Sequence, residues 1–283
     1  MRKPAFLAVL FIPVLLITSC FYGSDLFGVS NTRYSAEEDF SYSIDVTSQA
    51  GFLLQGINGT VELAGDPDAT TVEVWGTRRV KSESVADARQ NLEDLLVLVA
   101  TTADRVTVRT DQPEDTHGRS FIVNYHIVVP EALDVRVVHV NGEIEILSLT
   151  GDLDVISTNG EARIDSVFGD TVVNLTNGNL RLWEMFGDVE SNLSNGNVTA
   201  RVNMQGTTDC DLGVTNGQID LSVPFTSSAQ FSAAVTNGSI TLGSGFTLAD
   251  IQSTPTSLSG RLGTGLGTIR LRTTNGTIEM TGF

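Results

Sequence analysis

The sequence predicts an all-β fold, a parallel β-helix or β-solenoid whose coils are about 18–21 residues long, within the range of known repeat architectures. Glycine recurs every nine residues from Gly142 to Gly196, and asparagine precedes every second one, so the full repeat spans two such steps. A fixed repeat of this length is typical of stacked architectures, in which no repeat buries its apolar face alone. We interpret each repeat as one coil with an Asn-Gly corner and a Gly-Asp corner. The predicted structural corners are Asn141, Gly142, Asn159, Gly160, Asn177, Gly178, Asn195 and Gly196.

The residues that follow each of these glycines alternate in polarity. Two and four residues after them, 12 of 14 positions are apolar, and only Thr171 and Ser191 are exceptions. One and three residues after them, Val172 is the only apolar residue. Such alternation is typical of strands with one buried and one solvated face. Glycine and asparagine tolerate the positive φ of a sharp corner, and stacked asparagines can pass amide hydrogen bonds from coil to coil.

Two other architectures share parts of this pattern. Antiparallel hairpins would use Asn-Gly as a tight turn, and calcium-binding nonapeptide rolls share the nine-residue step. The fixed distance between Asn-Gly pairs favours coils that stack like on like, and single glycines followed by aspartate differ from the paired glycines of a calcium roll. Further Asn-Gly pairs up to Asn275 predict roughly eight coils and a rod ~40 Å long. One corner is missing between Asn237 and Asn275, whose separation in the sequence equals about two coils.

The chain is expected to divide into four parts. Residues 1–19 are a predicted lipoprotein signal peptide, 20–39 a lipidated cysteine and flexible tether, 40–139 an N-terminal β part with an inserted helix, and 140–283 the regular repeats. Helical spacing of apolar residues predicts one amphipathic helix at about 84–99, packed over one side or the open end of the β stack. Its apolar residues are Val85, Ala88, Leu92, Leu95, Leu96 and Val99.

The segment from Met1 to Cys20 resembles a bacterial lipoprotein signal. Arg2 and Lys3 precede an apolar run at 5–17, which is too short to span a bilayer comfortably and ends in Ile17-Thr18-Ser19-Cys20. The resemblance implies cleavage before Cys20, lipid on its sulfur, and a membrane-anchored protein of the cell envelope outside the cytoplasm. Phe21 stands where an inner-membrane retention signal has aspartate, which favours an outer membrane if the organism has one. An ordinary signal peptide or an uncleaved anchor is the alternative.

Composition limits the partners. The chain has 17 basic and 34 acidic residues and a net charge of −17, so nucleic acid is not expected to bind. Cationic peptides or metal ions would be attracted, although the charge can simply keep a β-rich rod soluble. With Cys20 lipidated, Cys210 is left alone and is expected to be a small buried thiol. The three histidines lack metal-ligand spacing, and we predict no metal site and no cofactor.

Two surface columns are candidate sites. One aspartate per coil follows a corner glycine and forms a possible cation column, unless each carboxylate simply accepts a hydrogen bond from the turn; these are Asp152, Asp170 and Asp188. Three aromatic residues fall near one corner of neighbouring coils and form a possible binding surface: Phe168, Trp183 and Phe186. Trp183 is in an outward position, where it could stack on a sugar ring or centre a protein contact. Corner packing or cover by the predicted helix is the alternative.

Several segments resemble a known family. They are an early Asn-Gly strand pair, the segment 125–130 leading into 138–144, and Thr-Asn-Gly repeats that end at 273–278. Over about 40–283, the chain is similar to the bacterial adhesin-like family of β-strand-repeat proteins of unknown function, related to the adhesin-head GIN domains. The resemblance implies a solenoid on the cell envelope, often lipid-anchored, and it brings no catalytic residues.

We therefore predict a non-catalytic binding or adhesin-like scaffold whose partner is an envelope glycan, peptide or protein. A polysaccharide-acting β-helix enzyme is the first alternative, but its nearest candidates, Glu145, Arg163 and Arg181, are more typical of a cross-coil charge ladder. A structural or stress-sensing envelope lipoprotein with a protein partner is the second. Ile278 and Met280 on the terminal strand, without a polar cap, predict an end-to-end homodimer.

Overall fold

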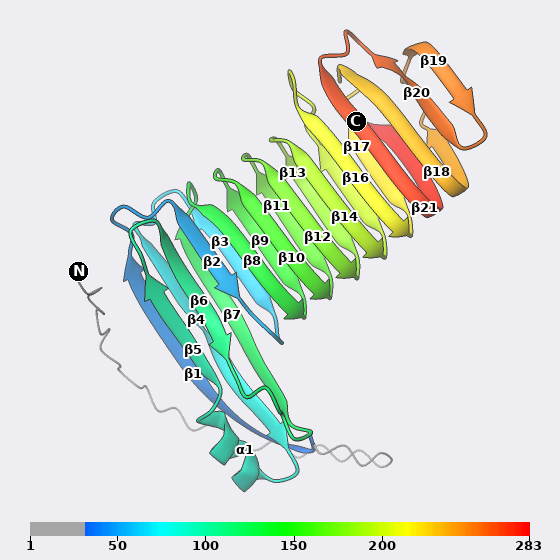
Figure 1. Ribbon diagram of the computed structural model, residues 1–283. Coiled ribbons are helices and arrows are strands. Elements are labelled where there is room, and N and C mark those ends of the chain that lie inside the picture. Colours follow the sequence, from blue (N-terminus) through cyan, green and yellow to red (C-terminus); the bar gives the residue numbers. More distant parts are fainter. Residues whose placement is uncertain (1–31) are drawn as a thin grey trace, which may run out of the picture.

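The computed structural model describes residues 32–283 and shows an elongated all-β molecule (Figure 1). Two stacks of strands face each other along the whole rod, and the one helix among residues 32–283 lies at the N-terminal end. The predicted signal peptide and Cys20 fall outside the described residues. The prediction of an all-β solenoid is confirmed.

Ten strands form the regular centre of the solenoid, two for each coil. They are β8 (Asp134–Asn141), β9 (Ile144–Leu149), β10 (Leu153–Asn159), β11 (Ala162–Val167), β12 (Thr171–Asn177), β13 (Leu180–Met185), β14 (Val189–Asn195), β15 (Val198–Val202), β16 (Asp209–Asn216) and β17 (Ile219–Val223). Each strand from β8 to β15 pairs in parallel with the strand two places on, one repeat later in the sequence, as in Leu153↔Thr171 and Ala162↔Leu180. The sequence offset between partners is larger at Val189↔Cys210, because the loop before β16 is longer.

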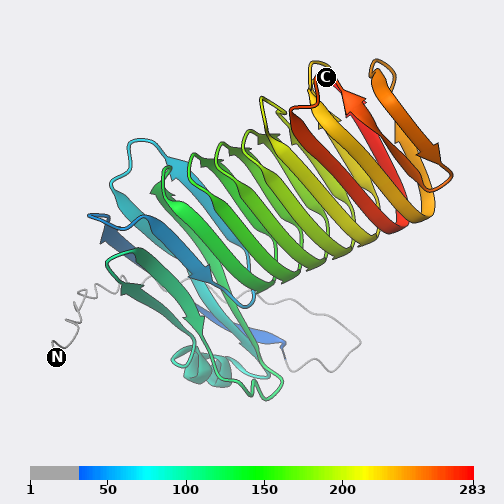
Figure 2. The ribbon, with the colours of Figure 1, turned by 45° about the horizontal axis from the view of Figure 1, so that its top comes forward.

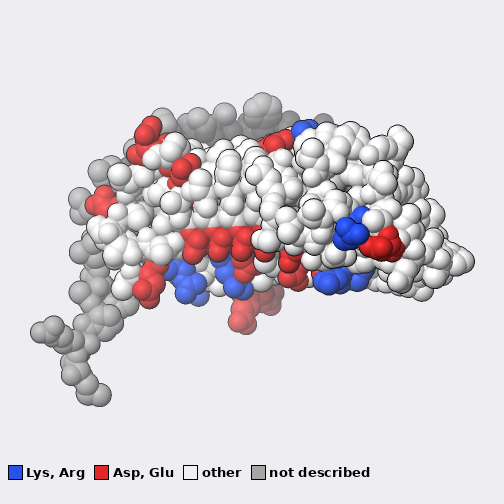
Figure 3. All heavy atoms as spheres, turned by 90° about the horizontal axis from the view of Figure 1, so that it is seen from above, with Lys and Arg blue, Asp and Glu red and all other residues white. Residues whose placement is uncertain are grey.

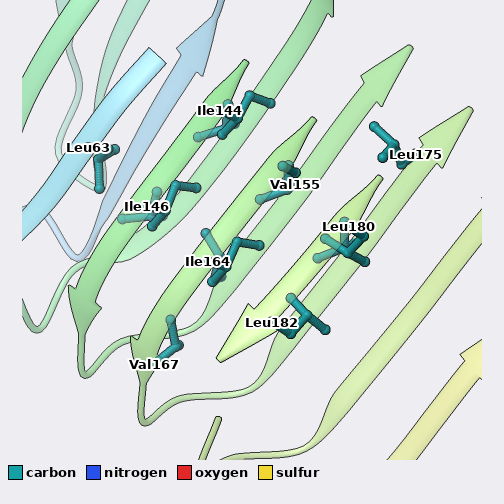
Figure 4. Close-up of a cluster of buried hydrophobic side chains, with 14 of the residues drawn as sticks. Leu63, Ile144, Ile146, Val155, Ile164, Val167, Leu175, Leu180 and Leu182 are labelled. Carbon is teal, nitrogen blue, oxygen red and sulfur yellow. The ribbon is translucent and has the colours of Figure 1, made fainter. Parts of the chain in front are cut away.

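The core lies between the two stacks and is filled by the inward positions of the repeat. Aliphatic side chains such as Ile144, Ile164 and Leu182 point into it from successive coils (Figure 4). The two polar residues at inward positions, Thr171 and Ser191, are also buried. The coil of β10 and β11 buries Leu153, Val155, Ser157, Ala162, Ile164 and Val167. One coil alone cannot shield this set from water, so the burial that stabilises the rod depends on the neighbouring coils on both sides.

The Asn-Gly corners form one continuous ladder of side-chain amides. Each asparagine after Asn58 donates through Nδ2 to the Oδ1 of the asparagine on the adjacent coil at 2.7–2.9 Å. In stacking order the ladder contains Asn58, Asn141, Asn159, Asn177, Asn195, Asn216, Asn275 and Asn237. The glycine that follows has positive φ, 139° at Gly178, and a Cβ atom there would overlap the carbonyl oxygen of Gly160. Only glycine fits this close stacking of corners.

The N-terminal layer forms one end of the rod. It combines parallel strands that continue the solenoid with antiparallel strands that close it. Its elements are β1 (Tyr34–Asp45), β2 (Gly51–Gln55), β3 (Val61–Asp66), β4 (Thr71–Ser82), α1 (Val85–Leu92), β5 (Leu96–Thr101), β6 (Arg105–Asp111) and β7 (Ser120–Pro130). β2 and β3 stack in parallel on β8 and β9, so the solenoid begins well before residue 140. Beyond them, β5 pairs antiparallel with β6 in one stack, and β1, β4 and β7 pair antiparallel in the other.

The structure differs from the predicted tether at 20–39. β1 begins at Tyr34, which pairs with Ser82 of β4. The polar composition of residues 34–39 reflects an edge strand rather than a linker, because Glu37 and Glu38 form ion pairs with Arg79 and Arg78 at 2.8 and 2.6 Å. Charged side chains on an edge strand also discourage pairing with other chains.

The predicted helix at 84–99 is correct at its start and wrong beyond Leu92. Ser84 caps the helix by accepting a hydrogen bond from the backbone of Asp87 at 3.1 Å. After Leu92 the chain turns, and residues 96–101 pair with β6 instead. The run of valine and leucine from Leu96 is compatible with a helix or a strand. It forms a strand here because β6 is available for pairing. The helix packs on β1 and β4 of the N-terminal layer.

The C-terminal end has an order of strands that the sequence did not predict. Its strands are β18 (Ala229–Leu242), β19 (Leu248–Thr254), β20 (Ser257–Leu262) and β21 (Gly267–Gly282). β21 lies between the β16–β17 coil and β18, as the turned view shows (Figure 2). No corner is missing from this described end, because Asn237 and Asn275 stack directly and the residues between them form the β19–β20 hairpin. Ile278 and Met280 are buried inside the stack, so the basis of the predicted end-to-end homodimer is wrong.

Candidate functional site

A surface groove of about 640 Å³ runs beside the Asn-Gly corner, across six successive coils. It follows the ends of β10, β12, β14, β16, β21 and β18, immediately before each asparagine. One row of exposed hydroxyl side chains borders it: Thr158, Thr176, Ser194, Thr215, Thr274 and Thr236. Because the coils stack in register, the groove presents one hydroxyl group per coil at the regular spacing of a parallel sheet, ~4.8 Å.

The middle of the groove is open because Gly213 has no side chain there. A Cβ atom at this position would lie 3.3 Å from Asn192 Oδ1 and 3.9 Å from a terminal nitrogen of Arg272. Asp211 holds the Arg272 guanidinium at 2.8 Å, and the Asn192 amide donates to Glu190 at 3.2 Å. The groove therefore offers hydroxyl, amide and guanidinium groups in fixed positions. None of its lining residues is a carboxylate or a histidine, so it can bind polar groups but has no acid–base pair.

The sequence reasoning missed this groove because it counted positions after each glycine. The signal stands before the corner, where threonine or serine directly precedes asparagine in six coils. Aligning the residues that precede each corner asparagine, coil by coil, shows this row of hydroxyl residues in the sequence.

The predicted aspartate column exists and is longer than expected. Five aspartates stand at the Gly-Asp corner or its equivalent, and a row of acidic side chains is visible along the rod from above (Figure 3). Each of the first four carboxylates accepts a hydrogen bond from the backbone N–H of the next aspartate, at 2.8–3.1 Å. The column comprises Asp134, Asp152, Asp170, Asp188 and Asp209. The backbone donors give the column a structural role, and cation binding stays a prediction.

The predicted aromatic surface separates into two groups. Phe168 stacks on Phe186 with ring centroids 4.3 Å apart and planes within 2°, and Phe168 is 55% exposed. Trp183 instead lies under two guanidinium groups, those of Arg181 at 5.0 Å and Arg201 at 5.2 Å from the ring centroid. These cation–π contacts occupy the Trp183 ring. Phe168 is therefore the aromatic side chain of this group most open to a ligand.

A further cluster lies in the N-terminal layer, where sequence reasoning found nothing. Trp75 of β4, 41% exposed, stacks on His126 of β7 with centroids 5.8 Å apart. His126 Nδ1 is 2.9 Å from Glu62 of β3, and Glu145 follows Glu62 in the same row. β7 is far from β3 and β4 in the sequence, so no local motif indicates the cluster. Its row continues to Arg163 and Arg181, the neighbours of Glu145 proposed from the repeat.

The single described cysteine is buried, and burial raises the pKa of the Cys210 thiol well above its usual range. This environment suits a core side chain and opposes nucleophilic reactivity. Among residues 32–283, no group of three or more histidine, cysteine, aspartate or glutamate side chains is arranged to hold a metal ion. No helix in that range is long and apolar enough to cross a membrane.

Comparisons with known proteins identify the family. Three solved structures resemble the chain: a proposed cell adhesion protein from Clostridium sporogenes (11% identity, TM-score 0.39, 88% of this chain and 100% of that chain), a proposed adhesin from Bacteroides fragilis (15%, 0.36, 90% and 100%) and one from Parabacteroides merdae (10%, 0.30, 86% and 95%). At these values the likenesses carry no argument about function. A comparison with curated proteins found no significant match. The model of the Toastrack DUF4097 family matches residues 119–281. Because this match covers more than half of the chain, from the start of β7 through β21, the protein belongs to the Toastrack DUF4097 family.

Proposed function

We propose that this protein is a non-catalytic binding scaffold of the cell envelope that holds a hydroxyl-rich, uncharged glycan strand in the groove beside the Asn-Gly corner. The observation that carries the proposal is the row of one hydroxyl group per coil across six coils. Hydroxyl and amide groups donate and accept hydrogen bonds, as sugar hydroxyls do. Because the groups that line the groove repeat from coil to coil, a polymer with a repeating unit fits it better than a single compact ligand does.

Charge supports an uncharged ligand. The chain carries a net charge of −17, which opposes the approach of anionic polymers. Within the groove Arg272 is the only charged lining residue, and Asp211 already pairs with it at 2.8 Å. The groove itself is thus close to electrically neutral, in contrast to the acidic Gly-Asp corner.

Retention on immobilised glycans tests the proposal directly. The chain from residue 24 onward, which contains every described strand, is passed over a panel of envelope glycans, and the eluate is analysed for new saccharides. We expect retention without products. Gly213→Leu fills the middle of the groove and should weaken retention about tenfold or more. Thr199→Leu, on the exposed face of the other stack, is the matched control and should bind as the unchanged protein does.

Three outcomes contradict this function. Equal retention of Gly213→Leu and the unchanged protein would move the binding site out of the groove, and Phe168→Ala would then test the exposed aromatic side chain. Release of new saccharides would favour the polysaccharide-acting enzyme instead, with Glu62, Glu145 and His126 as the first residues to replace. Binding to envelope proteins alone would favour the structural or stress-sensing lipoprotein.

We also propose that lipid on Cys20 anchors the scaffold to the membrane, on the outer membrane if the organism has one. The support is the basic start, the apolar run at 5–17 and the sequence Ile17-Thr18-Ser19-Cys20. Cys20→Ser should move the protein from the membrane fraction to the soluble fraction, whereas Cys210→Ser should leave it membrane-bound. A Cys20→Ser protein that stays in the membrane fraction would show that another feature anchors it.

A further inference from the structure

The C-terminal end of the rod is covered over only half of its width. β18 pairs with β21 along its whole length, from Ala229 to Leu242. On its other side, β20 pairs with β18 only from Ala229 to Ala234. The second half of β18, residues 236–242, therefore has one edge without a strand partner in the described chain. We call this the open edge.

The backbone at the open edge is arranged to receive another strand. In earlier coils, the N–H groups of Gly196 and Val198 donate to the carbonyl oxygens of the next coil at 3.0 and 2.9 Å. Gly238 and Ile240 occupy the same positions in the last coil, because they pair with Gly276 and Ile278 of β21. Their N–H groups therefore point away from β21, along the rod axis. Peptide groups in this orientation are the template for strand addition.

The hydrophobic core is also open at this place. In the neighbouring coil Ile278 and Met280 are 1% and 0% exposed, whereas Ile240 and Leu242, at the same inward positions, are only partly buried. Four partly buried apolar side chains of the C-terminal end pack against the core: Ile240, Leu242, Phe246 and Leu258. Leu258 comes from β20, so the hairpin forms one wall beside the open edge. A strand placed here would bury its inward side chains among these four.

Charge separates this edge from the edges of β1 and β19. No charged residue occurs from 221 to 249 in a chain that has 17 basic and 34 acidic ones. By contrast, β1 carries Glu37 and Glu38, and β19 has a register irregularity and an Asp250–Arg261 ion pair at 2.9 Å. From above, the C-terminal part of the rod shows few charged side chains and its extreme end shows none (Figure 3). Charges and bulges normally protect edges from pairing, and the open edge has neither.

We propose that the open edge is a docking site for an extended, uncharged peptide strand of a protein partner, which completes the last coil by β-augmentation. The vacant position requires apolar side chains at alternate residues, facing Ile240 and Leu242, and polar uncharged ones between them. A second copy of this chain fits less well, because in a two-fold pairing through residues 236–242 both β19–β20 hairpins would occupy the same space. Apart from Thr236, which belongs to both, this site is separate from the glycan groove, and it goes beyond the proposed function.

A synthetic strand provides the test. The probe peptide copies residues 273–281 with Glu279→Thr, which gives the polarity pattern of an interior strand without charge. The control peptide also has Ile278→Ser and Met280→Ser. We expect the probe to bind the chain from residue 24 onward with micromolar affinity, because one short strand buries little area. The control peptide should bind about tenfold more weakly or not at all.

Paired variants locate the binding. Ile240→Glu places a charge in the opening of the core and should weaken probe binding about tenfold or more, whereas Thr241→Glu adds the same charge on the outer face and should have little effect. Because the side chain at 240 is at the open end, both variants should fold, which circular dichroism checks. Hydrogen exchange gives an independent readout: the Gly238 and Ile240 amides should be protected only when the probe is bound.

Three results would overturn the proposal. They are the absence of saturable probe binding, equal binding by Ile240→Glu and Thr241→Glu, and protection of the Gly238 and Ile240 amides without probe at concentrations where the chain self-associates. The last result would assign the open edge to a second copy. None of these results changes the expected retention of glycans by the groove. The peptide-docking proposal can therefore be contradicted while the glycan-binding proposal stands, and the reverse.

Discussion

The solenoid and the N-terminal layer continue the same two stacks but differ in how their residues find partners. In the solenoid, partners are one repeat apart in the sequence, as in the Asn177–Asn159 amide bond. In the layer, the ion pair of Arg119 with Asp87 and the hydrogen bond from Tyr42 to Val97 join residues at unrelated, longer separations. The period of the sequence therefore determines contacts in the solenoid, whereas the layer depends on individual side-chain pairs. Variants can test this contrast directly.

The largest expected effect is on the solenoid corner. Gly178→Val should lower the free energy of unfolding by more than about 4 kcal/mol or prevent folding, because φ is positive and a side chain would overlap the corner of the previous coil. Gly51→Val in β2 is the control, where a Cβ atom would meet only ordinary contacts at 3.5 Å or more, and should cost less than about 1 kcal/mol. Denaturant unfolding measures both. A mild Gly178→Val would show that the corners tolerate rearrangement.

A smaller effect is expected in the layer, where Asp87 is the central ion-pair partner. The Arg119 guanidinium and the Ser82 hydroxyl hold the pKa of the Asp87 carboxyl well below its usual range. Because the folded pKa is lowered, this contribution to stability is present above the unfolded pKa of about 3.9 and is lost as the pH falls towards the folded pKa. Asp87→Asn should destabilise α1 at neutral pH and flatten its acid dependence.

Hydrogen exchange in α1 and β4 measures the effect of Asp87→Asn across pH 2–7. Asp115→Asn, which removes an exposed carboxylate of the same layer, is the matched control and should leave the exchange of α1 unchanged. Identical acid profiles for Asp87→Asn and the unchanged protein would show that the Arg119 pair does not stabilise the layer.

The amide ladder should show a graded effect along the solenoid. Asn177→Ala removes two ladder hydrogen bonds, one on each side, and should cost about 1 kcal/mol, because the amides are partly exposed. Asn237→Ala at the end of the ladder removes one, and should cost about half as much. Thermal and denaturant unfolding compare the two. Equal costs would indicate that the corner conformation, rather than the ladder, makes asparagine favourable.

The smallest effect is expected at Trp183. This residue lies in the solenoid, but its contacts are individual side-chain pairs, as in the N-terminal layer. Trp183→Ala should cost about 1 kcal/mol or less, because Arg181 and Arg201 lose the ring on which they pack. Glycan retention should stay unchanged, since the ring is already occupied. Loss of retention in this variant, with Thr199→Leu unaffected, would restore Trp183 as a sugar-stacking residue.

The same contrast explains how much the sequence could predict. Glycine and asparagine columns predicted the coil, its inward positions and the aspartate column, because partners repeat at one spacing. The order of β18 and β21 could not be predicted, since Asn237 and Asn275 fit the ladder in either order. The end of α1 was missed because the leucines from Leu92 to Leu96 suit both a helix and a strand. The cluster of Trp75 and His126 depends on strand pairings that no local pattern reports.

The insertion of β21 between β17 and β18 has a consequence for how the chain assembles during synthesis. Coils up to β17 can stack in the order in which they are made, each on a finished surface. β18 cannot reach its final place until residues 267–282 have also emerged, because β21 separates it from the rest of the stack. Until then the edge of β17, with Ile219 and Leu221 beside it, is uncovered. The last of the described strands to be synthesised, β21, is therefore inserted between two strands that are made before it. Before β21 is synthesised, the uncovered edge of β17 exposes the growing chain to aggregation.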